Sequence, residues 1–298
     1  MQRRRIRAIV LLTLAAIIAA LVPILIAEGS VHALRQRLPD ATYADWVTGQ
    51  TGAQWKSIQA TASDGARLDA WLFTPAAPNG AAVILLHGVN DSRLGMIGHA
   101  PYLLRAGFTV LMPDSRGHGS SGGTLMTYGI LESDDVHTWT GELFRDSRTQ
   151  RLYGLGASMG AAILIQSLAK EPRFRSIVAD SAFDSFEDIA YYRLEHISHL
   201  GRWASWPTAQ AGFLYVLCRY GVNLKQASPE AAIAATHVPI LLIHGARDVN
   251  IPPTHSRRLH ELNPTATELW LVPETPHIAA FGSHPEEYSA RVLEWFKK

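Results

Sequence analysis

Three residues spread over the second half of the chain have the types and order needed for chemistry on a carbonyl group. The first, Ser158, lies in the segment 156–160, Gly-Ala-Ser-Met-Gly, after a strand-like run at 152–155 and before a helix-like run. In that context the pattern predicts a nucleophile elbow, a tight strand-to-helix turn that projects the serine hydroxyl above a sheet. The flanking glycines remove Cβ atoms that would collide there. The alternative is an ordinary glycine-rich loop.

The residues downstream favour the elbow. Asp248 follows a strand-like run at 239–244, and His277 follows another at 269–272. Ser158 would attack a carbonyl carbon, His277 would take its proton and later protonate the leaving group, and Asp248 would orient the imidazole. The sequence therefore predicts acyl transfer by a serine, aspartate and histidine triad.

Other acids and histidines compete for these roles. Asp180 and Asp184 follow the strand-like run 176–179 and are alternative candidates for the acid of the triad. We prefer Asp248, which comes directly after a strand end, where open α/β sheets gather functional residues. The rival histidines fall within or beside helical segments rather than on the loop after the last strand: His255, His260 and His284.

Two backbone amides are candidates for the oxyanion hole, the donors that stabilise charge on the attacked oxygen. Val89 follows a buried strand and a glycine turn in the segment 85–90, and Met159 directly follows the candidate nucleophile. Both positions supply such N–H groups beside a nucleophile elbow. For His87, in the same turn, a hydrogen bond that braces the loop is favoured over direct chemistry.

The composition excludes several other functions. With 27 basic and 26 acidic residues the net charge is +1, which offers no field for steering nucleic acid. Cys218 is the only cysteine, so an intrachain disulfide and cysteine-rich zinc sites are excluded. The segment 154–160 departs from the dinucleotide fingerprint, and neither a phosphate loop nor the H-E-x-x-H spacing occurs. We expect no cofactor, no metal ion and no nucleic-acid partner.

The N-terminal segment predicts a membrane anchor. Four arginines within residues 1–7 precede an uncharged run at 8–27, which as a helix spans roughly 30 Å, the thickness of a bilayer core. A cleaved leader has a shorter apolar region and a clear cleavage site, and a buried core helix is a third alternative. The positive-inside rule then places residues 1–7 in the cytoplasm and the rest of this single-pass protein on the periplasmic or extracellular side.

The remaining chain divides into a stalk at 28–55 and a body at 56–298. The body opens with alternating apolar residues around a turn at 63–65, which predicts an antiparallel hairpin. Continuous apolar runs then alternate with helical segments, which predicts a mostly parallel sheet flanked by helices. The predicted strands are 82–86, 108–112, 152–155, 176–179, 240–243 and 269–272. The predicted helices are 100–106, 131–144, 159–170, 254–262 and 285–296.

An insertion at about 185–235 interrupts this alternation, between the candidate nucleophile and the candidate acid. It predicts a small helical cap over the site. Its aromatic residues would either line a substrate pocket or pack the core of the cap itself. These residues are Phe186, Tyr191, Tyr192, Trp203, Trp206, Phe213 and Tyr215.

Together these motifs resemble the α/β-hydrolase superfamily, and within it the membrane-anchored bacterial serine hydrolases grouped with serine aminopeptidase-like and dienelactone-hydrolase-like enzymes. The resemblance covers roughly residues 56–296, and the segments that carry it are 87–88, 114–122, 156–160, 244–248 and 276–277. It implies the α/β-hydrolase fold. It also implies bracing roles, in the loop after a strand, for Asp114, Arg116 and His118. At a helix start it implies capping and bracing roles for Glu132, Asp134 and Asp135.

The sequence thus predicts a membrane-anchored serine hydrolase that cleaves carboxylic esters or thioesters of a small or lipid-derived acyl substrate. A serine peptidase, similar to the aminopeptidase-like members, is one alternative. A noncatalytic binding module that keeps the fold is another. Oligomeric state stays open.

Overall fold

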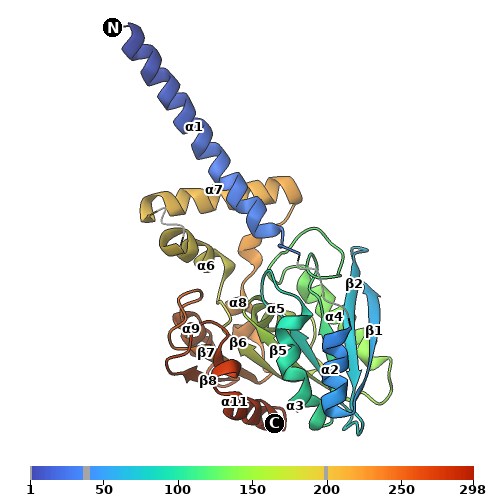
Figure 1. The fold of residues 1–298 in the computed structure, drawn as a ribbon. Coiled ribbons are helices and arrows are strands. Elements are labelled where there is room, and N and C mark those ends of the chain that lie inside the picture. The colour runs from blue at the N-terminus through green and yellow to red at the C-terminus, as the bar shows by residue number, and fades with distance from the viewer. Residues whose placement is uncertain (1, 36–40, 198–200) are drawn as a thin grey trace.

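An eight-stranded sheet forms the centre of the protein, and helices cover both of its faces (Figure 1). The computed structural model describes residues 2–35, 41–197 and 201–298. The other residues fall in the expected basic segment, stalk and cap and lie outside the described residues: 1, 36–40 and 198–200.

The sheet has the order β1-β2-β4-β3-β5-β6-β7-β8. Its strands are β1 (Gln54–Thr61), β2 (Arg67–Thr74), β3 (Ala81–Leu86), β4 (Thr109–Pro113), β5 (Arg151–Ala157), β6 (Phe174–Asp180), β7 (Ile240–Gly245) and β8 (Thr267–Val272). β2 is antiparallel to β1 and β4, and all other neighbouring strands are parallel. Every residue of β3 and β7 is buried, because helices cover both faces of the central strands.

The helices pack in two layers, each with its own hydrophobic core. One core joins the sheet to α4 and α5, and the other joins it to α2, α3 and α11. The helices outside the cap are α1 (Gln2–Val31), α2 (Thr42–Thr51), α3 (Ala100–Arg105), α4 (Glu132–Phe144), α5 (Met159–Ser167), α9 (Thr254–Leu262), α10 (Ala280–Ser283) and α11 (Pro285–Trp295). A short 3₁₀ helix, η1 (Arg93–His99), precedes α3.

The mostly parallel sheet flanked by helices is confirmed, and so is the antiparallel hairpin at its edge. Each predicted strand occurs within about two residues of its expected ends. The predicted helix 159–170 ends earlier, at Ser167, because the next three amides bond to carbonyls three residues back instead of four.

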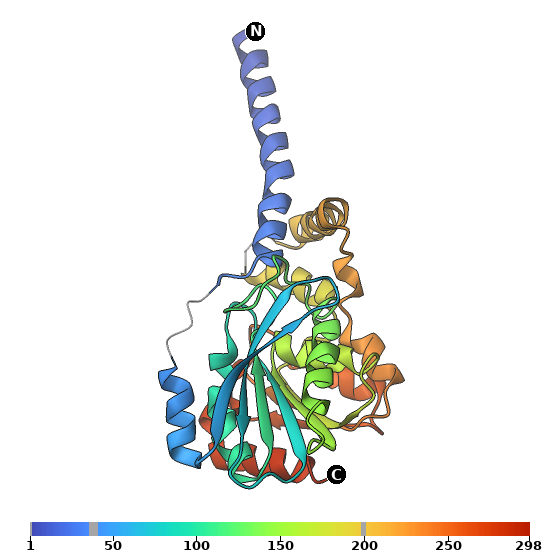
Figure 2. The same ribbon diagram turned by 90° about the vertical axis from the view of Figure 1, so that its right-hand side faces the viewer.

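Helix α1 projects away from the body, whereas the C-terminus lies at the opposite end of the molecule (Figure 2). Among the described residues it is the one helix that is long and apolar enough to cross a membrane, by length and composition. The helix continues past the expected run to Val31, whose carbonyl accepts a hydrogen bond from the amide of Met126 at 2.8 Å. Within the expected stalk, 28–55, helix α2 buries Ala44 and Val47 against the body. Both parts therefore dock on the body.

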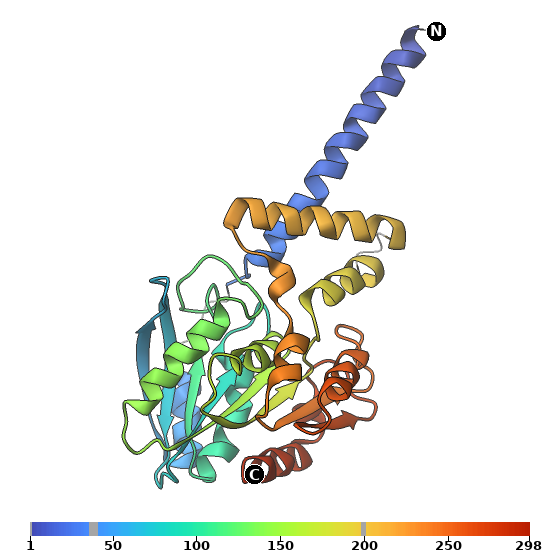
Figure 3. The same cartoon turned by 180° about the vertical axis from the view of Figure 1, so that it is seen from behind.

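Helical segments fill the chain between β6 and β7, where the sequence predicts a cap, and together they are called the cap. They are α6 (Phe186–Tyr192), a π-helical turn η2 (Arg193–Ile197), α7 (Arg202–Tyr220), a 3₁₀ turn η3 (Leu224–Gln226) and α8 (Pro229–Ala235). Helix α7 lies across the lower part of α1, above α6 (Figure 3). The cap and the end of α1 therefore stand over the same end of the sheet.

Candidate active site

Ser158 sits on the tight turn between β5 and α5. Its φ of 55° and ψ of −116° are strained for a residue with a side chain, as a nucleophile elbow requires. Close packing around the turn requires glycine at both glycine positions of the motif. A Cβ at Gly156 would collide with the carbonyl of Gly160, and a Cβ at Gly160 would collide with the carbonyl of Leu86. The turn can therefore form only because both positions lack side chains.

The structure brings the three residues of the predicted triad together. The Nε2 atom of His277 lies 3.0 Å from the Oγ atom of Ser158. Its Nδ1 atom lies 2.6 Å from the Oδ2 atom of Asp248. Because a carboxylate accepts and does not donate, Nδ1 carries the hydrogen and Nε2 is left free to accept the serine proton. This geometry is that of a nucleophile, a base and an orienting acid.

The carboxylate of Asp248 is held in its charged form. Its Oδ1 atom accepts hydrogen bonds from the amides of Asn250 and Ile251, both at 2.9 Å. Burial raises the pKa of this carboxyl, but hydrogen bonds with His244 and His277 outweigh burial and hold the pKa well below its usual range. An ionised Asp248 can therefore orient His277 and stabilise its charged form.

The rival acids have other partners. Asp180 accepts a hydrogen bond from the hydroxyl of Ser181 at 2.9 Å, and the Ser181 oxygen accepts from the amide of Ile278, beside His277. Burial raises the pKa of Asp180, which disfavours its charged form. Asp184 pairs at 2.6 Å with His255. Asp180 thus supports the loop of the candidate base without touching the imidazole.

None of the three rival histidines has a described contact with Ser158. His255 is the partner of Asp184, and His260 bonds the hydroxyl of Thr267 at 2.8 Å. His284 is exposed at the start of α11. His277 is the histidine that the structure places against the serine.

The two candidate oxyanion donors face the same small hollow as the serine. Val89, Met159 and Ser158 all line it. Met159 is the first residue of α5, where an amide has no partner within the helix. The hollow holds about 10 Å³, space for about one water, so side chains must move when a substrate binds.

Two buried histidines brace the loop that carries Val89. His87 accepts a hydrogen bond from the Ser115 amide at Nε2, so its Nδ1 donates to the carbonyl of Gly88, at 2.7 Å. Burial, together with the neighbouring His118, lowers the pKa of His87 to about 4, so the ring is neutral. His118 in turn accepts from the amide of Asn90 at 3.2 Å. The loop-bracing interpretation of His87 and His118 agrees with these contacts.

Buried ion pairs hold the following loop. Asp114 accepts from the side chain of Arg93 at 2.6 Å and from its amide at 2.8 Å. Arg116 makes a two-pronged pair with Asp135, at 2.6 and 2.8 Å. Glu132 accepts from three donors in the turn before α4, the amides at 127 and 129 and the hydroxyl at 127. The expected bracing roles of these residues therefore fit the contacts, whereas Asp134 pairs with Lys170 at the surface.

A second, apolar hollow of about 280 Å³ adjoins the first one. It lies between the end of α1, α6 and α7, and it shares four lining residues with the hollow at Ser158: Tyr128, Phe186, Ile189 and Arg193. Of the cap aromatics, Phe186 and Phe213 line it, whereas Trp203 and Trp206 point outward. Sequence reasoning missed Tyr128 and Arg193, which belong to no motif, and it missed the wall formed by α1.

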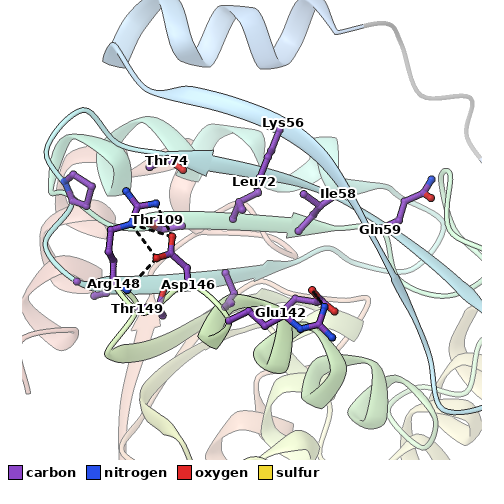
Figure 4. Close-up of a pocket in the computed structure, with 15 residues that line it drawn as sticks. Lys56, Ile58, Gln59, Leu72, Thr74, Thr109, Glu142, Asp146, Arg148 and Thr149 are labelled. Carbon is purple, nitrogen blue, oxygen red and sulfur yellow. Dashed lines mark hydrogen bonds and ion pairs between the residues drawn. The ribbon is translucent and has the colours of Figure 1, made fainter.

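A hollow of about 530 Å³ lies elsewhere (Figure 4). It lies at the N-terminal ends of β3 and β4, beside Ala81 and Thr109, and Ser158 and His277 are not among its lining residues. Its wall includes an ion pair between Asp146 and Arg148, at 2.6 Å. Within the part of the chain that the structure describes, no group of three His, Cys, Asp or Glu side chains is arranged to hold a metal ion.

Comparisons with known proteins agree with these features. Residues 77–205 match the model of a family described as serine aminopeptidase, S33. YfhR of Escherichia coli strain K12, described as an uncharacterized protein, is 30% identical over 260 residues, which cover 84% of each chain. A monoacylglycerol lipase of Mycolicibacterium smegmatis is 27% identical over 65% of this chain and 80% of its own. The esterase Pf2001 of Pyrococcus furiosus is 25% identical with a TM-score of 0.71, over 90% of this chain and 98% of its own.

Proposed function

Since this chain belongs to the α/β-hydrolase superfamily, in the family described as serine aminopeptidase S33, we propose that it cleaves carboxylic esters or thioesters. The observation that carries the proposal is the continuous contact from Ser158 through His277 to Asp248. The similar proteins from Pyrococcus furiosus and Mycolicibacterium smegmatis are described as an esterase and a monoacylglycerol lipase, and both names denote ester cleavage.

In the first half of the proposed reaction, the Oγ atom of Ser158 attacks the acyl carbon while its proton moves to Nε2 of His277. The amides of Val89 and Met159 donate to the oxygen that becomes negative. The bond from the acyl carbon to the leaving oxygen or sulfur then breaks, and His277 returns the proton to the leaving group. The acyl group remains bound to Ser158, and an alcohol or thiol departs.

In the second half, water replaces the alcohol. His277 takes a proton from the water, whose oxygen attacks the acyl carbon, and the bond to Ser158 breaks as His277 returns that proton to the serine oxygen. The free carboxylic acid leaves and the enzyme is restored. Asp248 stays ionised throughout and stabilises the charged imidazole.

The lining of the site favours an ester over the N-terminus of a peptide. An aminopeptidase needs a carboxylate near the nucleophile to bind the substrate amine. Among the described residues that line the hollow at Ser158 no carboxylate occurs, and the one charged side chain is the cation of Arg193. That cation would repel an amine.

Comparing two substrate series tests the proposal. The purified full-length protein is offered nitrophenyl esters of short acyl chains and nitroanilides of single amino acids. We expect turnover of the esters and turnover of the amides lower by at least about 10³-fold, because the amine finds no partner. Faster cleavage of the aminoacyl amides would replace the esterase with the peptidase. Turnover of neither series, in a folded protein, would favour the noncatalytic module.

Helix α1 is proposed as a single-pass anchor, with residues 1–7 in the cytoplasm and the body on the other side of the membrane. Its composition and length support this role. Sodium carbonate should leave the full-length protein in the membrane fraction, because a spanning helix is not held by charge. Protease added to intact spheroplasts should digest the body. Release by carbonate, or protection from protease, would contradict the anchor or its orientation.

A further inference from the structure

The apolar hollow beside the site has one wall that comes from the N-terminal helix. Pro23, Ile26 and Ala27 of α1 face Ala209 and Phe213 of α7 across it. Its volume of about 280 Å³ is near the lower end of ligand pockets, which run from about 300 to 1,000 Å³. Arg193 is the one charged residue among its described lining residues. A cavity of this kind accepts a hydrocarbon chain better than a polar group.

This wall is fixed in place by several contacts. The carboxylate of Glu28 accepts hydrogen bonds from the hydroxyls of Tyr215 and Tyr220, at 2.6 and 2.7 Å. The hydroxyl of Tyr128 donates to the carbonyl of Ser30 at 2.7 Å. Gly212 of α7 lies against α1: a Cβ there would be in ordinary van der Waals contact with the carbonyl oxygen of Pro23, at 3.5 Å, and with the Cβ of Ala27, at 3.6 Å. The end of α1 is therefore part of the cap, and the hollow between them is preformed.

The hollow leads to the nucleophile. The hollow at Ser158 and the apolar hollow share Tyr128, Phe186, Ile189 and Arg193, so each of these residues borders both spaces. An acyl carbonyl at Ser158 would have its chain directed between α6 and α7 toward α1. The route requires these side chains to shift, because the space at Ser158 is small.

The outward face of α7 indicates what lies beyond the hollow. Trp203 is 95% exposed and Trp206 is 63% exposed, and Leu214 and Leu217 are exposed on the same helix. At 100° per residue these four positions fall within a sector of about 80°. Arg202 and Arg219 flank the stripe and are exposed. Tryptophans with leucines on one face and arginines at the ends are typical of a helix that lies in a membrane interface.

The position of α7 along α1 identifies that interface as the surface of the bilayer. Helix α7 meets α1 near Pro23 and Ala27, where the uncharged run 8–27 ends (Figure 3). If this run crosses the bilayer, then α7, which lies across α1 at this point, is at the level where the hydrocarbon core ends. The exposed stripe and the anchor therefore contact the same membrane, and the hollow between them opens at its surface.

We infer that α1 and the cap together form an acyl-chain site, and that the substrate is a long-chain lipid ester resident in the bilayer. The chain occupies the hollow between α1, α6 and α7, and the ester carbonyl lies at Ser158. The anchor is thus a wall of the substrate site as well as a tether. This inference rests on the proposed function, ester cleavage at Ser158.

Chain-length preference tests the site in the full-length protein in detergent micelles. Nitrophenyl decanoate and nitrophenyl butyrate are the probes. In the wild type we expect kcat/KM to favour decanoate, by up to about fourfold for each methylene that becomes buried. Ala209→Phe fills the hollow from α7 and should lower the ratio of decanoate to butyrate at least tenfold. Ala211→Phe, on the exposed side of the same helix, should leave the ratio unchanged.

A second pair of variants tests the wall formed by α1. Ala27→Phe narrows the hollow, whereas Leu25→Phe lies on the exposed side of α1 and is its control. Only the first should lower the ratio. A wild-type ratio near one, or an unchanged ratio in folded Ala209→Phe and Ala27→Phe, would overturn the acyl-chain site while leaving the esterase intact. Absence of turnover with both esters would instead overturn the proposed function.

Contact of α7 with the bilayer has its own readout. Tryptophan fluorescence of the protein in phosphatidylcholine vesicles should be quenched when the lipid acyl chains carry bromine. The double variant Trp203→Phe/Trp206→Phe should lose most of that quenching, whereas Trp46→Phe, on α2, should keep it. Equal quenching in the wild type and the double variant would show that α7 does not lie in the membrane, and would overturn a substrate taken from the bilayer.

Discussion

The two ends of the sheet each carry a hollow, and the larger hollow is at the wrong end for chemistry. The one at the N-terminal strand ends measures about 530 Å³ and has the ion pair of Asp146 and Arg148 in its wall. The apolar one near the C-terminal strand ends measures about 280 Å³ and adjoins Ser158. Between these two hollows, size alone would choose the first. Position at the carboxyl ends of parallel strands, with a base and an acid in line, chooses the second.

The carboxylates at the two ends show the same contrast. The side chain of Asp248 is fully buried and bonds His277, whereas that of Asp146 is 46% exposed and pairs with Arg148. A buried carboxylate beside an imidazole sets its tautomer and charge. An exposed pair with arginine contributes little, because water screens it. An aspartate therefore controls the charge state of its partner at the Ser158 end of the sheet and has little effect at the other end.

Removing the base should have the largest effect. His277→Ala should lower kcat for ester hydrolysis by roughly 10⁶-fold, because among the described side chains His277 is the one whose hydrogen bond to the Ser158 hydroxyl is observed. The matched change at the other end, Arg148→Ala, should leave kcat within about twofold. Steady-state hydrolysis of nitrophenyl butyrate measures both. Comparable losses of kcat in His277→Ala and Arg148→Ala would contradict the assignment of the chemistry to the Ser158 end of the sheet.

Removing the orienting charge should have a smaller effect. Asp248→Asn keeps the shape but sets the wrong tautomer of His277, so kcat should fall about 10⁴-fold. Asp146→Asn is the control and should have no effect on kcat. If Asp248→Asn retained full activity, the acid would have to be sought elsewhere, with Asp180 as the first alternative.

Acid should destabilise the folded protein through a buried histidine, His99. Burial lowers the pKa of His99 to about 3, so the folded protein keeps the ring neutral. As pH falls below about 6.5 the unfolded chain binds a proton and the folded chain does not, so the free energy of unfolding decreases, by about 2 kcal/mol at pH 5. The decrease continues until the pH reaches about 3.

Urea unfolding at pH 7 and pH 5 measures this decrease. In His99→Gln the difference between the two pH values should shrink, whereas in the exposed His284→Gln it should stay as in the wild type. An identical pH dependence in His99→Gln and the wild type would show that His99 is not the buried neutral group that its surroundings require.

Much of the fold could be predicted because its strands are buried on both faces. The continuous apolar runs of β3, β5 and β7 have one interpretation in a chain of alternating strands and helices. The docking of α2 on the body was not anticipated in the predicted stalk, because docking depends on tertiary contacts that the local sequence does not reveal. Ala44 and Val47 give α2 a small apolar face that the sequence does not connect with any partner. The sequence likewise does not reveal the partners of Glu28, which lie in α7.

The candidate triad could be predicted because each member follows a strand end in a fixed order. The walls of the site could not. Tyr128 comes from an irregular loop and Arg193 from a π-helical turn, and neither belongs to a motif. The sequence predicts the wall residues up to 27 only as membrane anchor, because an apolar run has the same composition whether it faces lipid or the cap.

Covalent labelling of the serine tests the central claim most directly. A fluorophosphonate probe reacts with a serine whose proton a neighbouring base removes. The full-length wild type should be labelled, and Ser158→Ala, folded to the same extent, should not be labelled. Equal labelling of both proteins would contradict Ser158 as the nucleophile.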